Sequence, residues 1–358
     1  MLENKLHQLS PYIGKLKSTI ARDLLLKYSA PGDLVVDPFC GSGTVPFEAA
    51  SLQRRVIAAD VNPYAVMLTR AKLQHPSSVE EALDRMQQRL SEASNYDVDL
   101  RTVPSWVRRF FHPETLRDSL KFANACIAGA DNFLLSCLMG ILHHQRPGFL
   151  SYPSSHLVPY LRDNKYPRSR YPEMYERREL APRLEKKVRR ALCSPVAMHV
   201  ARQVECVSVE ALQLSPGVVD VIITSPPYMN ALDYVRDNRL RMWFLDRATT
   251  NYSPEPTDKR GSFDRLMGGF VSGCVSRLRP GGLCVLVVGE TVRRKRITTH
   301  PAKLIADRLA IVEPSLKLSR VVRDAIPDVR RSRNIGRATK EELVLVFEKS
   351  SARRSRVS

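Results

Sequence analysis

The stretch Asp33-Leu-Val-Val-Asp-Pro-Phe-Cys-Gly-Ser-Gly-Thr44 decides the fold of this chain. Residues 34–36 form an apolar run that predicts a short buried strand. Gly41 and Gly43 then open a helix that we expect to run over residues 45–52. Glycines at a strand-to-helix turn tolerate positive φ and let the backbone approach a ligand closely. The pattern therefore predicts a parallel α/β sheet with a ligand site at its first turn.

A second predicted strand, residues 55–59, ends in Asp60. An acid at the end of the second strand is placed to bind ribose hydroxyls in nucleotide-binding sheets. Asn62 and Pro63 then begin the next helix, as its N-cap and its first residue. Both predicted strands thus end in groups that suit a nucleoside.

The second informative stretch is Thr224-Ser-Pro-Pro-Tyr228, which follows an apolar run at residues 218–223. Two consecutive prolines fix φ and remove two donors, so nearby carbonyls are held out to accept hydrogen bonds. Ser225 stands just before the prolines and Tyr228 just after them. A rigid cluster of acceptors beside an aromatic ring suits a planar substrate that carries an exocyclic amine. The alternative is an ordinary proline-rich turn between a strand and a helix.

Together the two stretches resemble class I S-adenosylmethionine (SAM) dependent methyltransferases, in the branch that methylates amino groups of nucleobases. With Ser225 in the first motif position, the resemblance is closest to the DNA cytosine-N4 methyltransferases. It implies a Rossmann-like fold with a mostly parallel seven-stranded sheet and a large, mainly helical insertion. It also implies SAM as the cofactor and no metal ion. A cytosine-C5 enzyme would need a nucleophilic cysteine, usually in a Pro-Cys dipeptide, and this chain has no such dipeptide.

The resemblance carries over residue by residue. It also implies that Ser225 and the Pro226 carbonyl accept the amine hydrogens while Tyr228 stacks on a base flipped out of a duplex. Glu210 stands where these enzymes usually have an aspartate that binds the adenine amine. The implied catalytic residues are Ser225, Pro226, Pro227 and Tyr228, and the implied cofactor-binding residues are Tyr12, Asp37, Phe39, Cys40, Gly41, Ser42, Gly43, Thr44, Asp60, Val61, Asn62 and Glu210.

The composition favours a nucleic-acid partner. The chain has 358 residues, a formal net charge of +19 and a pI near 9.9. An excess that large suits a polyanion, with an acidic membrane surface as the lesser option. The seven cysteines are odd in number and include no Cys-x-x-Cys pair, which fits a reducing cytoplasm better than a disulfide framework. No window is apolar enough to span a bilayer, so we expect a cytoplasmic protein.

Strand and helix signals stop alternating in the middle of the chain. We therefore predict a catalytic domain at residues 1–75 and 204–349, an inserted target-recognition region at 76–203 and a basic disordered tail at 350–358. Residues 101–202 hold 18 lysines and arginines against 8 acids. Basic side chains interleaved with aromatics suit phosphate contacts and base stacking. The alternative is a charged helical cover over the sheet.

Further elements are predicted from local pattern. A strand is expected at residues 203–209, after the insertion, and another at 283–288, after a Pro-Gly-Gly turn. Helices are expected at residues 113–128 and 131–144. Three polar or basic loops are additional candidates for nucleic-acid contacts, at residues 249–262, 293–296 and 328–334.

Other functions stay open on the sequence. Many cytosine-N4 enzymes of restriction-modification systems place the Ser-Pro-Pro-Tyr half first, whereas here the cofactor half comes first. The same chemistry on adenine N6 in DNA, or on an amino group in structured RNA, is therefore the main alternative. A non-catalytic nucleic-acid binder that retains the fold is the third reading, and it predicts decay in one of the motifs.

Overall fold

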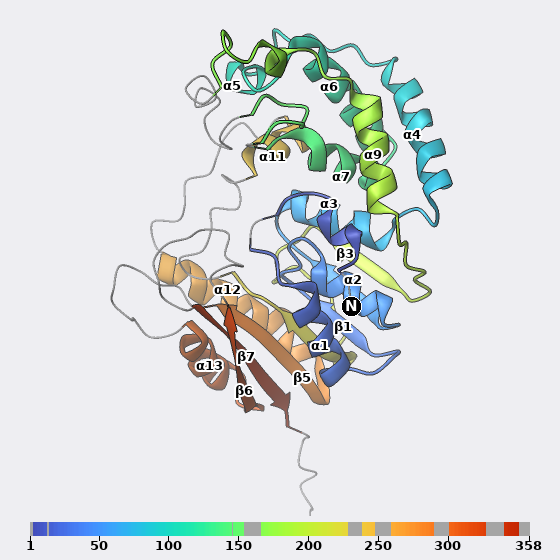
Figure 1. Ribbon diagram of the computed structural model, residues 1–358. Coiled ribbons are helices and arrows are strands. Elements are labelled where there is room, and N and C mark those ends of the chain that lie inside the picture. The colour runs from blue at the N-terminus through green and yellow to red at the C-terminus, as the bar shows by residue number, and fades with distance from the viewer. Residues whose placement is uncertain are drawn as a thin grey trace, which may run out of the picture. The chain divides into compact units, whose positions relative to one another are not determined.

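The computed structural model describes residues 3–12, 14–144, 146–153, 166–227, 238–247, 259–289, 301–326 and 340–350 (Figure 1). The chain divides into two units that each combine distant segments. The helical unit contains residues 1–13, 70–197 and 233–253, and the sheet unit contains residues 14–69, 198–232 and 254–358. Among the described residues, no helix has the length and apolar character needed to cross a membrane.

The sheet unit holds one seven-stranded sheet in the order β3-β2-β1-β4-β5-β7-β6. β7 is antiparallel to both of its neighbours, and the remaining pairs are parallel. The chain runs outward from β1 to β3 and then returns to place β4 on the other side of β1. Ligands of open α/β sheets bind at such a switch point, beyond the carboxyl ends of the strands. The strands are β1 Leu34–Asp37, β2 Arg55–Ala59, β3 Arg202–Glu205, β4 Val219–Thr224, β5 Leu278–Gly289, β6 Leu316–Ile326 and β7 Lys340–Lys349.

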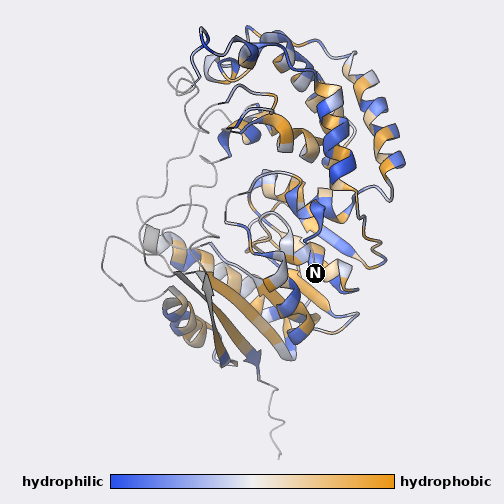
Figure 2. Ribbon diagram, in the orientation of Figure 1, coloured by the Kyte–Doolittle hydropathy of each residue, from blue (hydrophilic) through white to orange (hydrophobic). Residues whose placement is uncertain are grey.

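Helices cover both faces of this sheet. α12 (Lys259–Gly273) and α13 (Pro301–Val312) pack on one face, where Phe270 and Ile305 join a core cluster with Val36 and Leu286 of the strands. α1 (Ser18–Tyr28) and α2 (Thr44–Ser51) pack against each other and contact β1, β2 and β4. β5 is hydrophobic along its central part, as Figure 2 shows. Burial on both faces explains why the central strands are continuous apolar runs.

The helical unit is built from amphipathic helices around a separate core. Phe122, Leu138 and Leu184 are fully buried members of it, and α4, α6, α7 and α9 contact one another. α3 begins in the sheet unit and ends in this one. The helices are α3 Pro63–Leu73, α4 Val79–Ala93, α5 Ser105–Arg108, α6 Pro113–Ala128, α7 Asn132–Leu142, α9 Leu180–Ala191 and α11 Arg239–Leu245, with short 3-10 turns at Lys5–Gln8 and Pro172–Tyr175.

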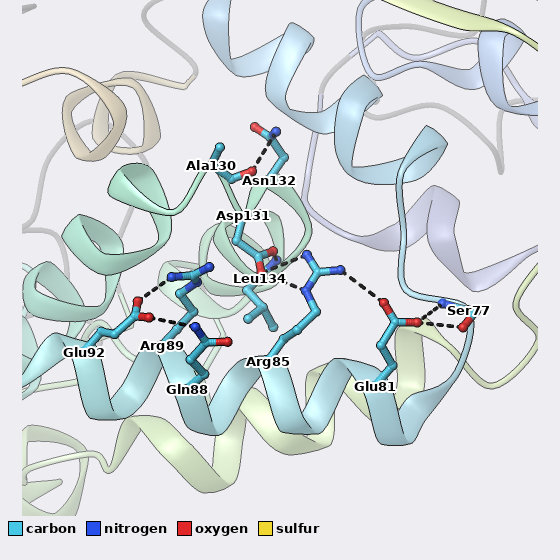
Figure 3. Close-up of polar contacts among 10 residues, drawn as sticks. All are labelled: Ser77, Glu81, Arg85, Gln88, Arg89, Glu92, Ala130, Asp131, Asn132 and Leu134. Atoms are coloured by element: carbon cyan, nitrogen blue, oxygen red, sulfur yellow. Dashed lines mark hydrogen bonds and ion pairs between the residues drawn. The ribbon is translucent and has the colours of Figure 1, made fainter.

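A buried ion pair joins α4 to the turn between α6 and α7 (Figure 3). Arg85 of α4 lies 2.8 Å from the carboxylate of Asp131, which is 3% exposed. The same carboxylate accepts the Leu134 backbone N–H at 3.0 Å and so caps α7. At the start of α4, Ser78 accepts the Glu81 backbone N–H at 3.1 Å. These bonds fix where two helices begin and how they meet.

The structure confirms many predicted elements and corrects several. The helix at residues 113–128 and the strand at 55–59 have the predicted bounds. The strand predicted at 203–209 ends already at Glu205, which pairs with Ala59 at the end of β2. The last backbone bond between the two segments runs from the Asp60 N–H to the Glu205 carbonyl, at 3.3 Å. The predicted Pro-Gly-Gly turn lies inside β5, which begins at Leu278 and has an irregular register beside Val219 and Val221.

By their contacts, residues 1–13 and 233–253, which the sequence places next to the sheet elements, group with the helical unit. Their polar contacts give the physical reason. The Lys187 ammonium of α9 donates to the Gln8 carbonyl at 2.7 Å. Arg241 of α11 donates to the carbonyls of Met139 and His143, at 3.1 and 3.0 Å, near the end of α7. Both contacts bridge long stretches of sequence, which local patterns do not show.

We expect Arg241→Met to lower the free energy of unfolding of the helical unit by about 2 to 4 kcal/mol, because two buried carbonyls lose their donors. Both tryptophans of the chain, Trp106 and Trp243, lie in this unit, so their fluorescence during urea unfolding follows it. Arg247→Met, at an exposed arginine just after the same helix, should cost less than about 0.5 kcal/mol. Equal losses in the two variants would contradict the anchoring role.

Candidate active site

The turn between β1 and α2 is shaped by two glycines in the left-handed region. Gly41 has φ 50° and Gly43 has φ 72°. The Gly43 N–H donates to the Cys40 carbonyl at 2.8 Å, which closes the turn. A Cβ built on Gly43 would lie 2.6 Å from Oγ1 of Thr69 and 2.9 Å from its Cα. Glycine is therefore required at position 43 by both conformation and space.

Thr69 of α3 packs against the turn and forms a hydrogen bond with it. Its hydroxyl donates to the Gly41 carbonyl at 3.3 Å and lies 3.4 Å from the Cys40 sulfur. Burial raises the pKa of the Cys40 thiol well above its usual range, and the nearby carboxylates of Asp60 and Asp37 raise it further. Cys40 is thus a protonated packing residue at neutral pH. Thr69 was not predicted as a site residue, because its contact with the turn depends on how α3 packs, which no local pattern shows.

Asp60 stands at the end of β2 and is held by backbone donors. One carboxylate oxygen accepts the Gly41 N–H at 2.9 Å, and the other accepts the Asn62 N–H at 2.9 Å. Asn62 in turn caps α3 by accepting the Tyr64 N–H at 3.0 Å, as predicted. A carboxylate offers about four lone-pair sites, so Asp60 retains capacity for ligand hydroxyls. Burial raises the pKa of Asp60, and the backbone donors oppose that shift.

A buried hydrogen bond connects the two motifs. The Thr224 hydroxyl, at the end of β4, donates to Oδ1 of Asp37, at the end of β1, at 2.6 Å. Asp37 also accepts the Phe39 N–H at 3.3 Å. Burial raises the pKa of Asp37 from its ordinary 3.8 to about 7, against the lowering effect of the Thr224 bond. Thr224 was not predicted as a site residue, although it is the first residue of the Thr-Ser-Pro-Pro-Tyr motif.

The remaining predicted site residues have different environments. Pro226 is buried, whereas Ser225 and Pro227 are half-buried just beyond β4. Phe39 packs against Phe270 of α12, with ring centroids 5.7 Å apart. Val61 is an apolar side chain that is 69% exposed directly after Asp60. The structure thus brings the end of β1 and its turn together with the ends of β2 and β4.

The structure also describes two further predicted residues, Glu210 and Tyr12. Glu210 lies in a turn five residues beyond β3, and its side chain fills the space over Gly269 of α12. Tyr12 is half-buried and belongs to the helical unit. Tyr228 lies outside the described residues, as do the loops at 293–296 and 328–334 and most of the loop at 249–262.

Short stretches of the chain match known methyltransferases. A protein family described as DNA methylase matches residues 14–72. Over 68 residues the chain is 31% identical to the Type II methyltransferase M.MjaII of Methanocaldococcus jannaschii, a match that covers 19% of this chain and 13% of that protein. Over 65 residues it is 38% identical to the tRNA (guanine(10)-N2)-dimethyltransferase of Methanothermobacter thermautotrophicus, covering 18% of this chain and 19% of that protein.

Similar solved structures include TrmN from Thermus thermophilus, at 14% identity and a TM-score of 0.39, with 96% of this chain and 52% of that chain covered. Another is a SAM-dependent methyltransferase from Methanosarcina mazei, at 10% identity and a TM-score of 0.38, with 91% and 97% covered. Because both TM-scores lie below 0.5, the fold assignment depends on the strand order and on the matched segment.

The strand order, the single antiparallel β7 and the glycine turn define a Rossmann-like SAM-dependent methyltransferase fold. Within that class, the chain resembles the DNA amino-methyltransferases that modify N4 or N6.

SAM is the cofactor that this resemblance implies, and the residues present fit it. Gly41 and Gly43 take the backbone after β1 through the left-handed region, as in glycine turns that approach a ligand closely. Asp60 keeps acceptor capacity for ribose hydroxyls beside the exposed Val61, whose side chain could cover an adenine face. Asp37 supplies a carboxyl group at the neighbouring strand end, which suits a cationic ligand. When bound, SAM supplies a methyl group made electrophilic by its sulfonium.

We expect Gly43→Ala to weaken SAM binding by at least about tenfold, because the new methyl group displaces Thr69 and the turn that it supports. Gly32→Ala is the matched control. Gly32 also has positive φ, at 88°, but nothing lies within 4 Å of its built Cβ. Both variants should lose about 1 to 2 kcal/mol of stability from backbone strain. Isothermal titration with SAM separates the two effects, and equal affinities would contradict the assignment of this turn.

The raised pKa of Asp37 predicts that the stability of the protein depends on pH. Its folded pKa, about 7, lies above its ordinary 3.8, so the folded protein keeps a proton that the unfolded chain releases. That contribution is complete below about pH 4 and is lost as the pH rises through 7. Relative to Asp37→Asn, which cannot ionise, the wild type should lose on the order of 3 kcal/mol between pH 4 and 8. Urea unfolding at a series of pH values measures this difference, and parallel curves would show that Asp37 does not titrate in this way.

Proposed function

We propose that this protein transfers a methyl group from SAM to an exocyclic amine of a nucleobase, with cytosine N4 in DNA as the leading target. One observation carries the proposal. The Thr224–Asp37 hydrogen bond joins the end of the cofactor turn's strand to the residue before the Ser-Pro-Pro turn. A cofactor site and a set of amine acceptors therefore share one edge of the sheet, as methyl transfer to an amine requires.

The chemistry assigned to the chain's own residues is modest. The Ser225 hydroxyl and the Pro226 carbonyl accept the two hydrogens of the substrate amine. These bonds favour a pyramidal nitrogen whose lone pair is available for attack, and they hold it in line with the methyl group. The prolines keep both acceptors in place, because they fix the backbone after β4. Tyr228 stacks on the base, a role assigned from the motif alone.

The net charge of +19 and the relatives support a polynucleotide substrate. The Type II methyltransferase among the similar proteins favours DNA, and the basic helical region is then the part that recognises the target sequence. Residues 76–203 remain our proposal for the core of that region, now with 233–253 added. A protein of this kind works on a base taken out of the duplex, at a cost of a few kcal/mol.

A second candidate is the same chemistry on RNA. The tRNA dimethyltransferase among the similar proteins matches at 38% identity, higher than the Type II methyltransferase. An adenine N6 target in DNA would use the same acceptors, because adenine also presents an exocyclic amine. The third reading, a non-catalytic binder, is disfavoured because the glycine turn, Asp60 and the Ser-Pro-Pro turn are all intact.

We expect labelled methyl from SAM to enter duplex DNA as N4-methylcytosine when duplex DNA, single-stranded DNA and total RNA are compared in parallel. Tyr228→Ala should abolish this transfer while SAM binding stays unchanged, because stacking needs an aromatic face. Tyr228→Phe keeps the ring and should keep most of the activity. Mass spectrometry of the nucleosides identifies the product. Label confined to RNA would overturn the DNA assignment, and full activity of Tyr228→Ala would remove the stacking role.

A further inference from the structure

A cation lies stacked on an aromatic side chain in the helical unit. The guanidinium carbon of Arg239, the first residue of α11, is 4.2 Å from the ring centroid of Trp106 in α5. The Trp106 ring makes edge contacts with Phe110 and with Trp243, both at 6.4 Å between centroids. Trp243 is 2% exposed and Phe110 is 1% exposed, so the Trp106 indole packs against two buried aromatic side chains. We call Trp106 and Arg239 the stacked pair.

The stacked pair holds an exposed charge in one orientation. Arginine normally loses about 2 kcal/mol of side-chain entropy when it is fixed, so a surface arginine is usually mobile. Stacking on an indole face is attractive and restricts that freedom. It covers one face of the guanidinium only, and the five N–H donors lie in its plane, so their edges stay available to another group.

Arg239 differs from other exposed arginines of the helical unit in its partners. Arg177 lies 3.1 Å from Glu114 and 3.2 Å from Asp118, and Arg189 lies 2.8 Å from Glu185. For Arg239, the described part of the chain provides no carboxylate within ion-pair distance. Its charge is therefore stacked on an aromatic ring and is not paired with an acid that the structure describes.

Two further arginines are exposed close in sequence to α5 and α11. Arg108 is exposed at the end of α5, two residues after Trp106, and Arg247 is exposed just after α11. Arg247 donates to the amide oxygen of Asn124, a neutral partner. Over the residues that the structure describes, neither arginine forms an ion pair with an acid. Three exposed arginines, on or next to α5 and α11, thus have no ion-pair partner among the described residues.

We propose that the stacked pair is a phosphate-binding point for the polynucleotide substrate, with Arg239 donating two N–H bonds to one backbone phosphate and Trp106 holding it in place. Bidentate guanidinium–phosphate bonds are strong and directional, and a fixed arginine makes them without further loss of freedom. The inference rests on the proposed function, because it takes the substrate to be a nucleic acid. It assigns the contact to the phosphate backbone and not to a base edge.

The test measures binding of the full-length protein to a labelled duplex DNA and to a labelled stem-loop RNA over a range of salt concentrations. Each phosphate contact on duplex DNA adds about 0.9 to the slope of log affinity against log salt. Arg239→Gln should reduce the magnitude of that slope by about 0.9, the value of one phosphate contact. It should also weaken binding by about tenfold at low salt. Trp106→Phe should weaken binding less and keep the slope, since the charge remains. Arg177→Gln is the control, because it changes the net charge equally at an arginine that is already paired.

The outcomes separate this inference from the proposed function. A smaller slope for Arg239→Gln, with an unchanged slope for Arg177→Gln, supports the phosphate contact, and the tighter polynucleotide identifies DNA or RNA as its source. Equal slopes in both variants overturn the contact, while methyl transfer to nucleic acid would leave the proposed function standing. If the wild type binds neither polynucleotide but binds polyglutamate through Arg239, both the contact and the nucleic-acid assignment fail. SAM titration and thermal unfolding confirm that each variant is folded.

Discussion

The hydrogen bond from Thr224 to Asp37 is the contact on which the proposed site depends. It joins strands that are neighbours in the sheet and 187 residues apart in the chain. Because both groups are buried, the bond is made in a medium of low effective dielectric, where losing it leaves an unpaired polar group. It fixes where the Ser-Pro-Pro turn after β4 lies relative to the glycine turn after β1. A displacement of about 1 Å between reacting groups can cost two orders of magnitude in rate, so this register matters for methyl transfer.

The turn itself is held by a set of short, mutually dependent contacts. Asp60 accepts from Gly41, Gly41 is also bonded by Thr69, and Thr69 occupies the space that a side chain at position 43 would need. Each contact uses a backbone group or a small side chain of the turn and its neighbours. Glycine adopts the left-handed conformation at positions 41 and 43 without strain, whereas other residues would be strained there. The site is therefore preorganised by backbone geometry, with little left to side-chain rearrangement.

The sequence predicted the sheet side of the site because the necessary signals are local. Asp37, the glycines, Asp60 and the Ser-Pro-Pro turn all stand at strand ends that apolar runs make visible. The helical unit was harder to predict, because its organisation depends on contacts between distant segments. α9 carries Leu184 and Val188 at helical spacing but stands among basic residues, and it was not predicted. The place of α11 could not be predicted, because the carbonyls that Arg241 binds lie about 100 residues earlier.

Buried arginines hold irregular segments of the helical unit, as Arg54 does in the sheet unit. Arg178 donates to the carbonyls of Ser151 and Met174, and Arg241 donates to the end of α7. Neither arginine meets a carboxylate among the described residues, and both donate to backbone acceptors instead. Carbonyls at helix ends and in irregular segments otherwise lack partners, and a guanidinium can satisfy several of them at once. The unit thus fixes segments that no ladder could hold, and α11 is one of them. The bonds from Arg241 therefore also hold in place the helix that carries Arg239 of the stacked pair.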